Sequence, residues 1–315
     1  MSTVHHSVIL ESEQRFGGRV PPRICGVFLS QLDVQIRHSI SMAFRGASHA
    51  RGRPPRWLQA TSDIRFVQIE GRDTTVLHFE APTFGDAAPE LYEQGELWPR
   101  RPDHRHTGFE VFADLLRDIA AQNRESDRFD PALLRGFRGF GRVFDEFFRE
   151  ARIEDLRGDA RDFAVLAPAT IDSARRLGSE APPARRVRVV GVLDMIREST
   201  QTFAIRLESG EEVHGILVEG SLSSFSSLFN KRVAAEGRGV FRPSGGFLRL
   251  DADAIVPGEG VSEYFSRVPT PLARAVRKIE WQKPQTPSTG VNAFFGRWPG
   301  DESEEELLAA LDELS

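Results

Sequence analysis

The sequence contains a single cysteine, Cys25, and so cannot form a disulfide bond within the chain. The absence of disulfides is typical of proteins in reducing compartments, and we therefore expect a cytoplasmic protein. There is also no run of about eighteen apolar residues, the length needed to cross a bilayer. Residues 1–22 lack the basic start and apolar run of a secretory signal. We expect a soluble protein that is not exported and has no membrane partner.

The chain as a whole has no excess of positive charge, since its formal net charge is −5. The segment from Asp301 onward holds seven of the 46 acidic side chains and no basic one, so residues 1–300 carry 41 basic against 39 acidic side chains. Because residues 1–300 are close to neutral in net charge, we do not expect them to bind nucleic acid without sequence or structural preference. Any nucleic-acid site must therefore be local.

The sequence also lacks the patterns of enzymes and metal sites. No glycine-rich phosphate loop is present, and Cys25 lies among apolar residues, which favours a buried, inert thiol. His104 and His106 stand two apart in an expected loop, while Asp251 and Asp253 have no His or Lys close by in the sequence. We therefore predict no catalytic residue, no metal ligand and no cofactor.

Residues 23–180 have the mixed pattern of an α+β domain, and we expect residues 1–22 to form a flexible N-terminus before it. Apolar spacing predicts helices over 31–44, 109–122 and 170–177. Residues 64–69 and 74–79 are typical of a hairpin, 163–166 of a strand, and 82–106 of an irregular crossing. Asp130 followed by Pro131 indicates a helix start. A ridge of aromatic core residues is predicted next: Phe137, Phe140, Phe144, Phe147 and Phe148.

Residues 185–256 carry the clearest fold signal. Their pattern predicts three strands over 186–197, 202–207 and 212–218, a helix within 221–229, and two strands over 232–241 and 247–255. Gly191 is expected to form a bulge in the long first strand. Three strands, a helix and two strands is the order of the five-stranded OB barrel, so we predict an OB-like β-barrel.

Such a barrel binds ligands across its second and third strands, beside the loops between strands one and two and strands four and five. Those loops are residues 198–201 and 242–246. Single-stranded nucleic acid needs stacking aromatics and basic side chains, for which Phe203, Arg206 and Arg242 are candidates. A place in the barrel core is the alternative for Phe203, as it is for Phe241 and Phe247.

A second nucleic-acid candidate lies in the N-terminal region. The segment Arg51-Gly-Arg-Pro54 matches the core of an AT-hook, in which two arginines follow a narrow minor groove and the glycine lets the backbone approach it. The alternative is a solvated loop. Arg51 and Arg53 are therefore candidates for DNA contact.

The last segment, residues 291–315, follows a connecting segment and linker over 257–290. Phe294, Phe295 and Trp298 lie around a glycine and a proline, which excludes a continuous helix through them. A short amphipathic helix is predicted from Ser303, with a capping box to Glu306. Its apolar side is leucine, at Leu307, Leu308, Leu311 and Leu314. A helix of about twelve residues is marginal in water, so this stripe must pack on the protein's own body or on a partner.

Residues 294–314, Phe-Phe-Gly-Arg-Trp-Pro-Gly-Asp-Glu-Ser-Glu-Glu-Glu-Leu-Leu-Ala-Ala-Leu-Asp-Glu-Leu, resemble the C-terminal tails of bacterial type II antitoxins whose partners are PIN-domain ribonuclease toxins. The resemblance implies that the tail wraps a toxin, that its aromatic and leucine residues fill surface grooves, and that a basic side chain plugs the acidic, metal-binding active site. Arg297 is the residue in position to do so. The small DNA-binding domain that usually precedes such a tail is not recognisable.

Taken together, the patterns predict an α+β domain, an OB-like barrel and a partner-docking tail. Our hypothesis is an antitoxin-like protein that is not an enzyme and that neutralises a PIN-type ribonuclease through its tail. The alternative is a nucleic-acid-binding protein that acts through the barrel. A third possibility is an enzyme whose site lies in the N-terminal half and has no recognisable sequence pattern.

Overall fold

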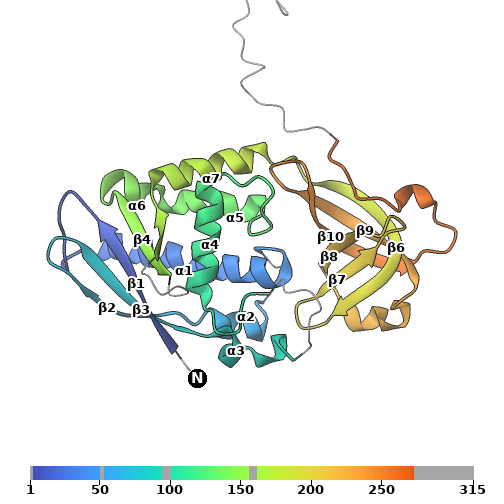
Figure 1. The fold of residues 1–315 in the computed structure, drawn as a ribbon, viewed down its shortest axis with the longest axis horizontal. Helices are drawn as coiled ribbons and strands as arrows, with labels where there is room; N and C mark the ends of the chain where they lie inside the picture. Colours follow the sequence, from blue (N-terminus) through green and yellow to red (C-terminus); the bar gives the residue numbers. More distant parts are fainter. Residues whose placement is uncertain (1–2, 50–52, 94–100, 156–161, 273–315) are drawn as a thin grey trace, which may run out of the picture. The chain divides into compact units, whose positions relative to one another are not determined.

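The computed structural model of the chain describes residues 3–49, 53–93, 101–155 and 162–272. These residues form a domain of helices and one antiparallel sheet, followed by a closed five-stranded β-barrel (Figure 1). The α+β class and the five-stranded barrel expected from the sequence are confirmed. The expected tail helix lies outside the described residues. None of the described helices is long and apolar enough to span a bilayer.

The N-terminal sheet is built around a strand that the sequence did not lead us to expect. β1 (Thr3–Glu11) is the central strand and pairs with β3 on one side and β4 on the other. Its alternating side chains bury His6, Val8 and Leu10. The expectation of a flexible N-terminus is therefore wrong for this segment, because its pairing partners come from distant parts of the chain. The sheet order is β2 (Arg65–Glu70), β3 (Thr75–Pro82), β1, β4 (Glu150–Asp155) and β5 (Asp162–Leu166).

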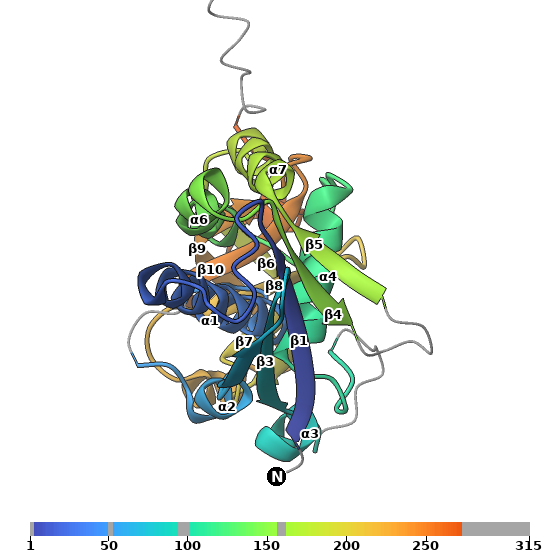
Figure 2. The same cartoon turned by 90° about the vertical axis from the view of Figure 1, so that its left-hand side faces the viewer.

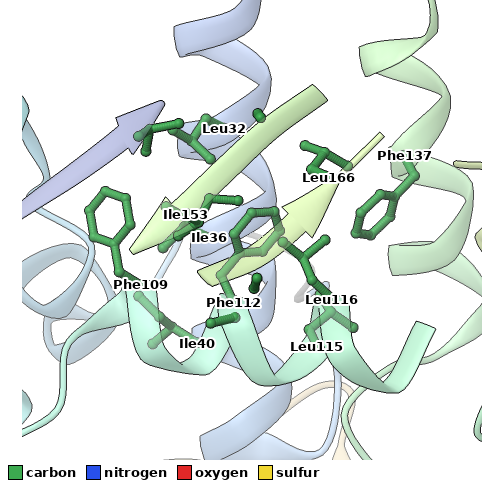
Figure 3. Packing of buried hydrophobic residues seen from close by; sticks show 14 of the residues in the cluster. Leu32, Ile36, Ile40, Phe109, Phe112, Leu115, Leu116, Phe137, Ile153 and Leu166 are labelled. Atoms are coloured by element: carbon green, nitrogen blue, oxygen red, sulfur yellow. The ribbon is translucent and has the colours of Figure 1, made fainter. Parts of the chain in front are cut away.

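Helices cover one face of this sheet, whose strands lie toward the viewer in Figure 2. The longest, α1 (Pro22–Arg45), packs against α4 (Gly108–Ala120). Both present the apolar stripes that the sequence predicted, and their side chains meet in the core drawn in Figure 3. Gly108 permits this close packing, because a Cβ there would lie 2.5 Å from Cγ2 of Ile36.

The predicted helix start at Asp130 is confirmed. Its carboxylate accepts hydrogen bonds from the backbone of Ala132 and Leu133 at the first turn of α5 (Pro131–Gly136). The phenylalanine ridge that follows is largely buried in the same core, with Phe147 only partly so. The remaining helices are α2 (Arg56–Thr61), α3 (Phe84–Ala87), η1 (Pro89–Leu91), η2 (Phe137–Phe140), α6 (Gly141–Glu146) and α7 (Pro168–Glu180).

The barrel strands close in the order β10-β8-β7-β6-β9, with β8 and β10 paired in parallel and the other neighbours antiparallel. The elements are β6 (Arg185–Arg197), β7 (Thr202–Arg206), β8 (Glu212–Leu217), η3 (Leu222–Leu228), β9 (Arg232–Phe241), β10 (Phe247–Pro257) and η4 (Glu263–Phe265). The predicted helix between strands three and four is the 3₁₀ helix η3.

The expected bulge in β6 is displaced along the strand. The register against β7 shifts between Leu193 and Met195, beyond Gly191. Gly191 has another role, because a Cβ at this position would lie 2.4 Å from the carbonyl oxygen of Arg206. The glycine therefore allows close approach of two strands.

Candidate functional site

The aromatic candidate for nucleic-acid stacking is enclosed in the barrel. Phe203 on β7 is fully buried, and its ring lies against Gly215 of β8, where a Cβ would lie 2.3 Å from the ring. A base has no open ring face to stack on, so the assignment of Phe203 to a binding surface is wrong and the core alternative holds. Phe241 is also fully buried, and Phe247 packs partly against the same core.

The two arginine candidates of the barrel already have acidic partners. Arg206 lies 3.4 Å from a carboxylate oxygen of Asp194 and remains half exposed. Arg242 donates through Nε to Oδ1 of Asp127 at 2.8 Å and through Nη1 to the carbonyl oxygen of Phe247. Because Asp127 belongs to the N-terminal domain, Arg242 is committed to a contact between the two domains.

The loop between β6 and β7, residues 198–201, is held by the N-terminal domain. The indole Nε1 of Trp57 donates to the carbonyl oxygen of Ser199 at 2.9 Å. Nε of Arg45 donates to the carbonyl oxygen of Thr200 at 3.1 Å. The Trp57 side chain is buried, and this hydrogen bond satisfies its single polar group, the indole N–H.

The loop between β9 and β10, residues 242–246, is held in the same way. A guanidinium nitrogen of Arg124 donates to the carbonyl oxygen of Pro243 at 3.1 Å, and the amide of Ser244 donates to the carbonyl oxygen of Arg124 at 3.2 Å. Both loops that would flank a ligand therefore bind the protein's own N-terminal domain. The edge of the barrel at which we expected nucleic acid is occupied.

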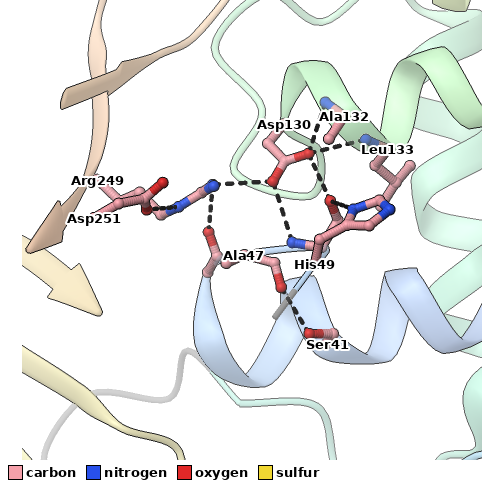
Figure 4. A network of polar contacts seen from close by, with 10 residues as sticks. Ser41, Ala47, His49, Asp130, Ala132, Leu133, Arg249 and Asp251 are labelled. Atoms are coloured by element: carbon pink, nitrogen blue, oxygen red, sulfur yellow. Dashed lines mark hydrogen bonds and ion pairs between the residues drawn. The ribbon is translucent and has the colours of Figure 1, made fainter. Parts of the chain in front are cut away.

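A buried ion pair lies at the centre of this junction (Figure 4). One carboxylate oxygen of Asp130 caps the N-terminus of α5 by accepting hydrogen bonds from its backbone amides. The other oxygen lies 3.1 Å from Nη1 of Arg249 on β10. Ser48 adds a hydroxyl bond of 2.7 Å and an amide bond of 3.1 Å to the same carboxylate. The side chains of Asp130 and Arg249 are only 2 % and 10 % exposed. Removing Arg249 would leave the carboxylate of Asp130 buried without its cationic partner.

Further bonds complete the surroundings of the pair. Arg249 donates through Nε to Oδ1 of Asp251 at 2.6 Å and through Nη1 to the carbonyl oxygen of Gly46 at 2.9 Å. Burial by itself would raise the pKa of Asp130, but the charge of Arg249 and the bonds from Leu133 and Ser48 outweigh burial and hold that pKa below its usual value. Asp130 is therefore an ionised structural group.

Two histidines lie beside this network. Nδ1 of His49 is 2.8 Å from the Ser48 hydroxyl. Since the single hydroxyl proton is donated to Asp130, His49 is the donor in this bond. The ring of His38 lies over that of His49, with centroids 3.9 Å apart. Burial, followed by the neighbouring His49, lowers the pKa of His38 to about 4, so it is neutral at physiological pH.

The other titratable candidates do not converge. In the described ranges no three His, Cys, Asp or Glu side chains gather in a possible metal site. His104 lines a shallow open pocket with Tyr92 and Arg105, and its nearest carboxylate is that of the adjacent Asp103 at 3.4 Å. Burial raises the pKa of the Cys25 thiol, which disfavours the reactive thiolate.

The remaining predicted residues divide between an exposed loop and the undescribed part of the chain. Arg53 is exposed, while Arg51 lies outside the described residues. The same is true of all tail candidates, which are Phe294, Phe295, Arg297, Trp298, Leu307, Leu308, Leu311 and Leu314.

Sequence reasoning missed the residues that form the junction. Neither Trp57 nor Arg249 was predicted to lie between the two domains. Nothing local distinguishes these two residues, because their partners lie more than a hundred positions away in the sequence. Comparison of the chain with protein-family models finds no match, and comparisons with curated proteins and with solved structures find none either.

Proposed function

We propose that the chain is an antitoxin-like protein that binds a PIN-type ribonuclease through residues 291–315 and thereby neutralises it. The observation that carries the proposal is the tail sequence, in which aromatic residues around Gly296 and Pro299 precede a capped stripe of leucines and acids. An amphipathic helix with aromatic anchors is a common way to fill a groove on another protein. Such a partner acts in the bacterial cytoplasm, where the lone cysteine stays reduced.

The described residues support a platform role for the rest of the protein. Its two hydrophobic cores are made by residues between Val8 and Ile255, with the last partly buried contribution at Val268. The barrel loops hold the N-terminal domain, which leaves recognition of a protein partner to other parts of the chain.

The barrel is best interpreted as OB-like, because its third and fifth strands pair in parallel and its first and fourth strands close the circle. Its loop edge does not favour the alternative function of nucleic-acid binding. Phe203 is buried, and Arg242 is engaged by Asp127. We therefore assign that edge a structural role.

The tail residues are expected to divide the work of binding and inhibition. Trp298, Phe294, Leu307 and Leu311 supply most of the affinity, since full burial of each contributes roughly 1.5 to 3 kcal/mol. Arg297 instead enters the acidic site of the ribonuclease, where its guanidinium forms charge-assisted hydrogen bonds and competes with the metal for carboxylate oxygens.

The test uses the purified full chain and a PIN-type ribonuclease from a neighbouring reading frame. Trp298→Ala should weaken binding and inhibition together, whereas Arg297→Ala should restore RNA cleavage to a complex that still forms. Arg175→Ala, an exposed arginine of α7 paired with Asp172, is the matched control and should change neither. If Trp298→Ala binds and inhibits as the parent does, the tail is not the binding element. If only Arg297→Ala is silent, inhibition comes from steric exclusion.

A further inference from the structure

The outer surface of the barrel carries aromatic and arginine side chains that no contact between the domains uses. On η4, Tyr264 is 62 % exposed and meets Phe265 edge to face, with ring centroids 5.4 Å apart. The guanidinium of Arg267 lies 3.7 Å from the Tyr264 ring centroid. That of Arg188, on β6, lies 5.4 Å from the ring of Phe265. We call these four residues, with Arg186 and Arg238, the arginine–tyrosine surface.

The strands beneath η4 extend this surface with a repulsive pair. Arg186 on β6 and Arg238 on β9 are direct cross-strand partners, and like charges in that position destabilise a sheet. Asp253 compensates Arg186 at 3.5 Å, and Glu236 forms an ion pair with Arg188. Within the described ranges no carboxylate lies at ion-pair distance from Arg238. An anion from outside the chain would relieve the repulsion.

Arg267 is the second uncompensated cation of the surface. Among the residues that the structure describes, no carboxylate lies at ion-pair distance from its guanidinium, which contacts the ring of Tyr264. Glu263 lies one residue before that tyrosine and is exposed. Asp251, the cross-strand partner of Arg238 on β10, is already hydrogen bonded to Arg249. The four arginines therefore face Asp253, Glu236 and Glu263, which leaves a small positive excess. The surface therefore combines a largely exposed tyrosine ring, which Arg267 contacts, with a small excess of positive charge.

We infer that the arginine–tyrosine surface binds single-stranded nucleic acid, with a base stacked at Tyr264 and phosphates contacted by Arg238 and Arg267. Stacking on exposed aromatics with nearby arginines is the general chemistry of single-strand binding. Because the positive excess is small, stacking must supply more of the affinity than phosphate neutralisation does. This site is distinct from the β7–β8 edge expected from the sequence, and it does not depend on the proposed ribonuclease partner.

The experiment measures fluorescence anisotropy of the full chain with labelled single strands of about twelve nucleotides, both RNA and DNA. At low salt we expect weak, saturable binding with a shallow salt dependence, since only about two phosphates are neutralised. Tyr264→Ala should weaken it about tenfold, the effect of losing one stacked base, and Tyr264→Phe should restore it. Arg238→Ala should lower the salt slope by about one unit.

Two controls and two competitors make the result decisive. Arg175→Ala on α7 should bind as the parent does. Arg206→Ala reports on the β7–β8 edge and should also be silent. Absence of binding at low salt, or binding that Tyr264→Ala leaves unchanged, would overturn the inference. The inference would also be overturned if polyglutamate displaced the labelled strand as effectively as unlabelled oligonucleotide does. The surface would then be a docking site for an acidic polypeptide.

Discussion

Asp130 and Arg249 form a buried ion pair at 3.1 Å that joins the N-terminal domain to the barrel. The same carboxylate starts helix α5, so the helix and the domain contact depend on one side chain. The two loops that would flank a ligand on such a barrel lie in this contact as well. The domains are thus expected to unfold together.

Asp130→Ala should lower the free energy of unfolding by about 3 kcal/mol, the lower end of the range for breaking a buried ion pair, because Arg249 would remain buried with Asp251 as its remaining carboxylate partner. Loss of the helix cap accounts for about 1 kcal/mol of that change. Urea titration followed by circular dichroism measures it. Asp172→Ala removes an exposed pair with Arg175 on α7 and should cost no more than about 1 kcal/mol. A similar small effect at Asp130 would show that the pair does not hold the domains.

His38→Gln should flatten the pH dependence of stability on the acid side of neutrality. The pKa of His38 is lowered to about 4 in the folded protein, whereas the unfolded chain keeps the ordinary value of 6.5. Between these values the unfolded state takes up a proton that the folded state does not, so stability falls as the pH falls. Asp130 affects stability at lower pH, because the stabilisation from its ionised form is lost as the pH falls from the ordinary aspartate pKa toward its depressed folded-state pKa. The urea midpoint of parent and variant is measured between pH 7 and pH 4. An equal fall in both proteins would contradict the lowered pKa of His38.

Two glycine substitutions compare a position between paired strands that has no room for a Cβ with a helix position that has open space. A Cβ at Gly237 on β9 would lie 2.1 Å from the carbonyl oxygen of Asp251 on β10, so Gly237→Ala should destabilise the barrel by about 2 kcal/mol or more. Gly26, in the exposed part of α1, has open space at the same position. Gly26→Ala should stabilise the protein by about 0.5 to 1 kcal/mol through helix propensity. The free energy of unfolding of both variants is measured by thermal or urea denaturation. Equal changes in the two variants would contradict the prediction.

Truncation after Gly290 should leave the melting temperature of the body almost unchanged while abolishing capture of the ribonuclease. Pro284 and Pro287 are expected to interrupt any helix through the linker, and the two described cores are built from residues 8–268. Differential scanning calorimetry and a pull-down with purified partner report the two properties. A large fall in melting temperature would show that the tail stabilises the body.

Much of the architecture could be predicted from local pattern. The helix start at Asp130, the phenylalanine ridge behind it and the order of the barrel strands all depend on residues close together in the sequence, where spacing and capping chemistry act directly. The candidate site was less predictable. Phe203 has the residue type of a stacking platform, and only the closure of the barrel against Gly215 places it inside.

The sequence by itself determined the main helices of the first domain, the five-stranded barrel of the second, and the unusual aromatic and leucine pattern of residues 291–315. The tertiary structure alone decided that β1 is the central strand, that the barrel loops bind Trp57 and Arg45, and that Asp130 serves two elements at once. The physical reason is distance along the chain. Local propensities are properties of neighbouring residues, whereas these contacts gain their energy only when segments far apart in the sequence meet and exclude water between them.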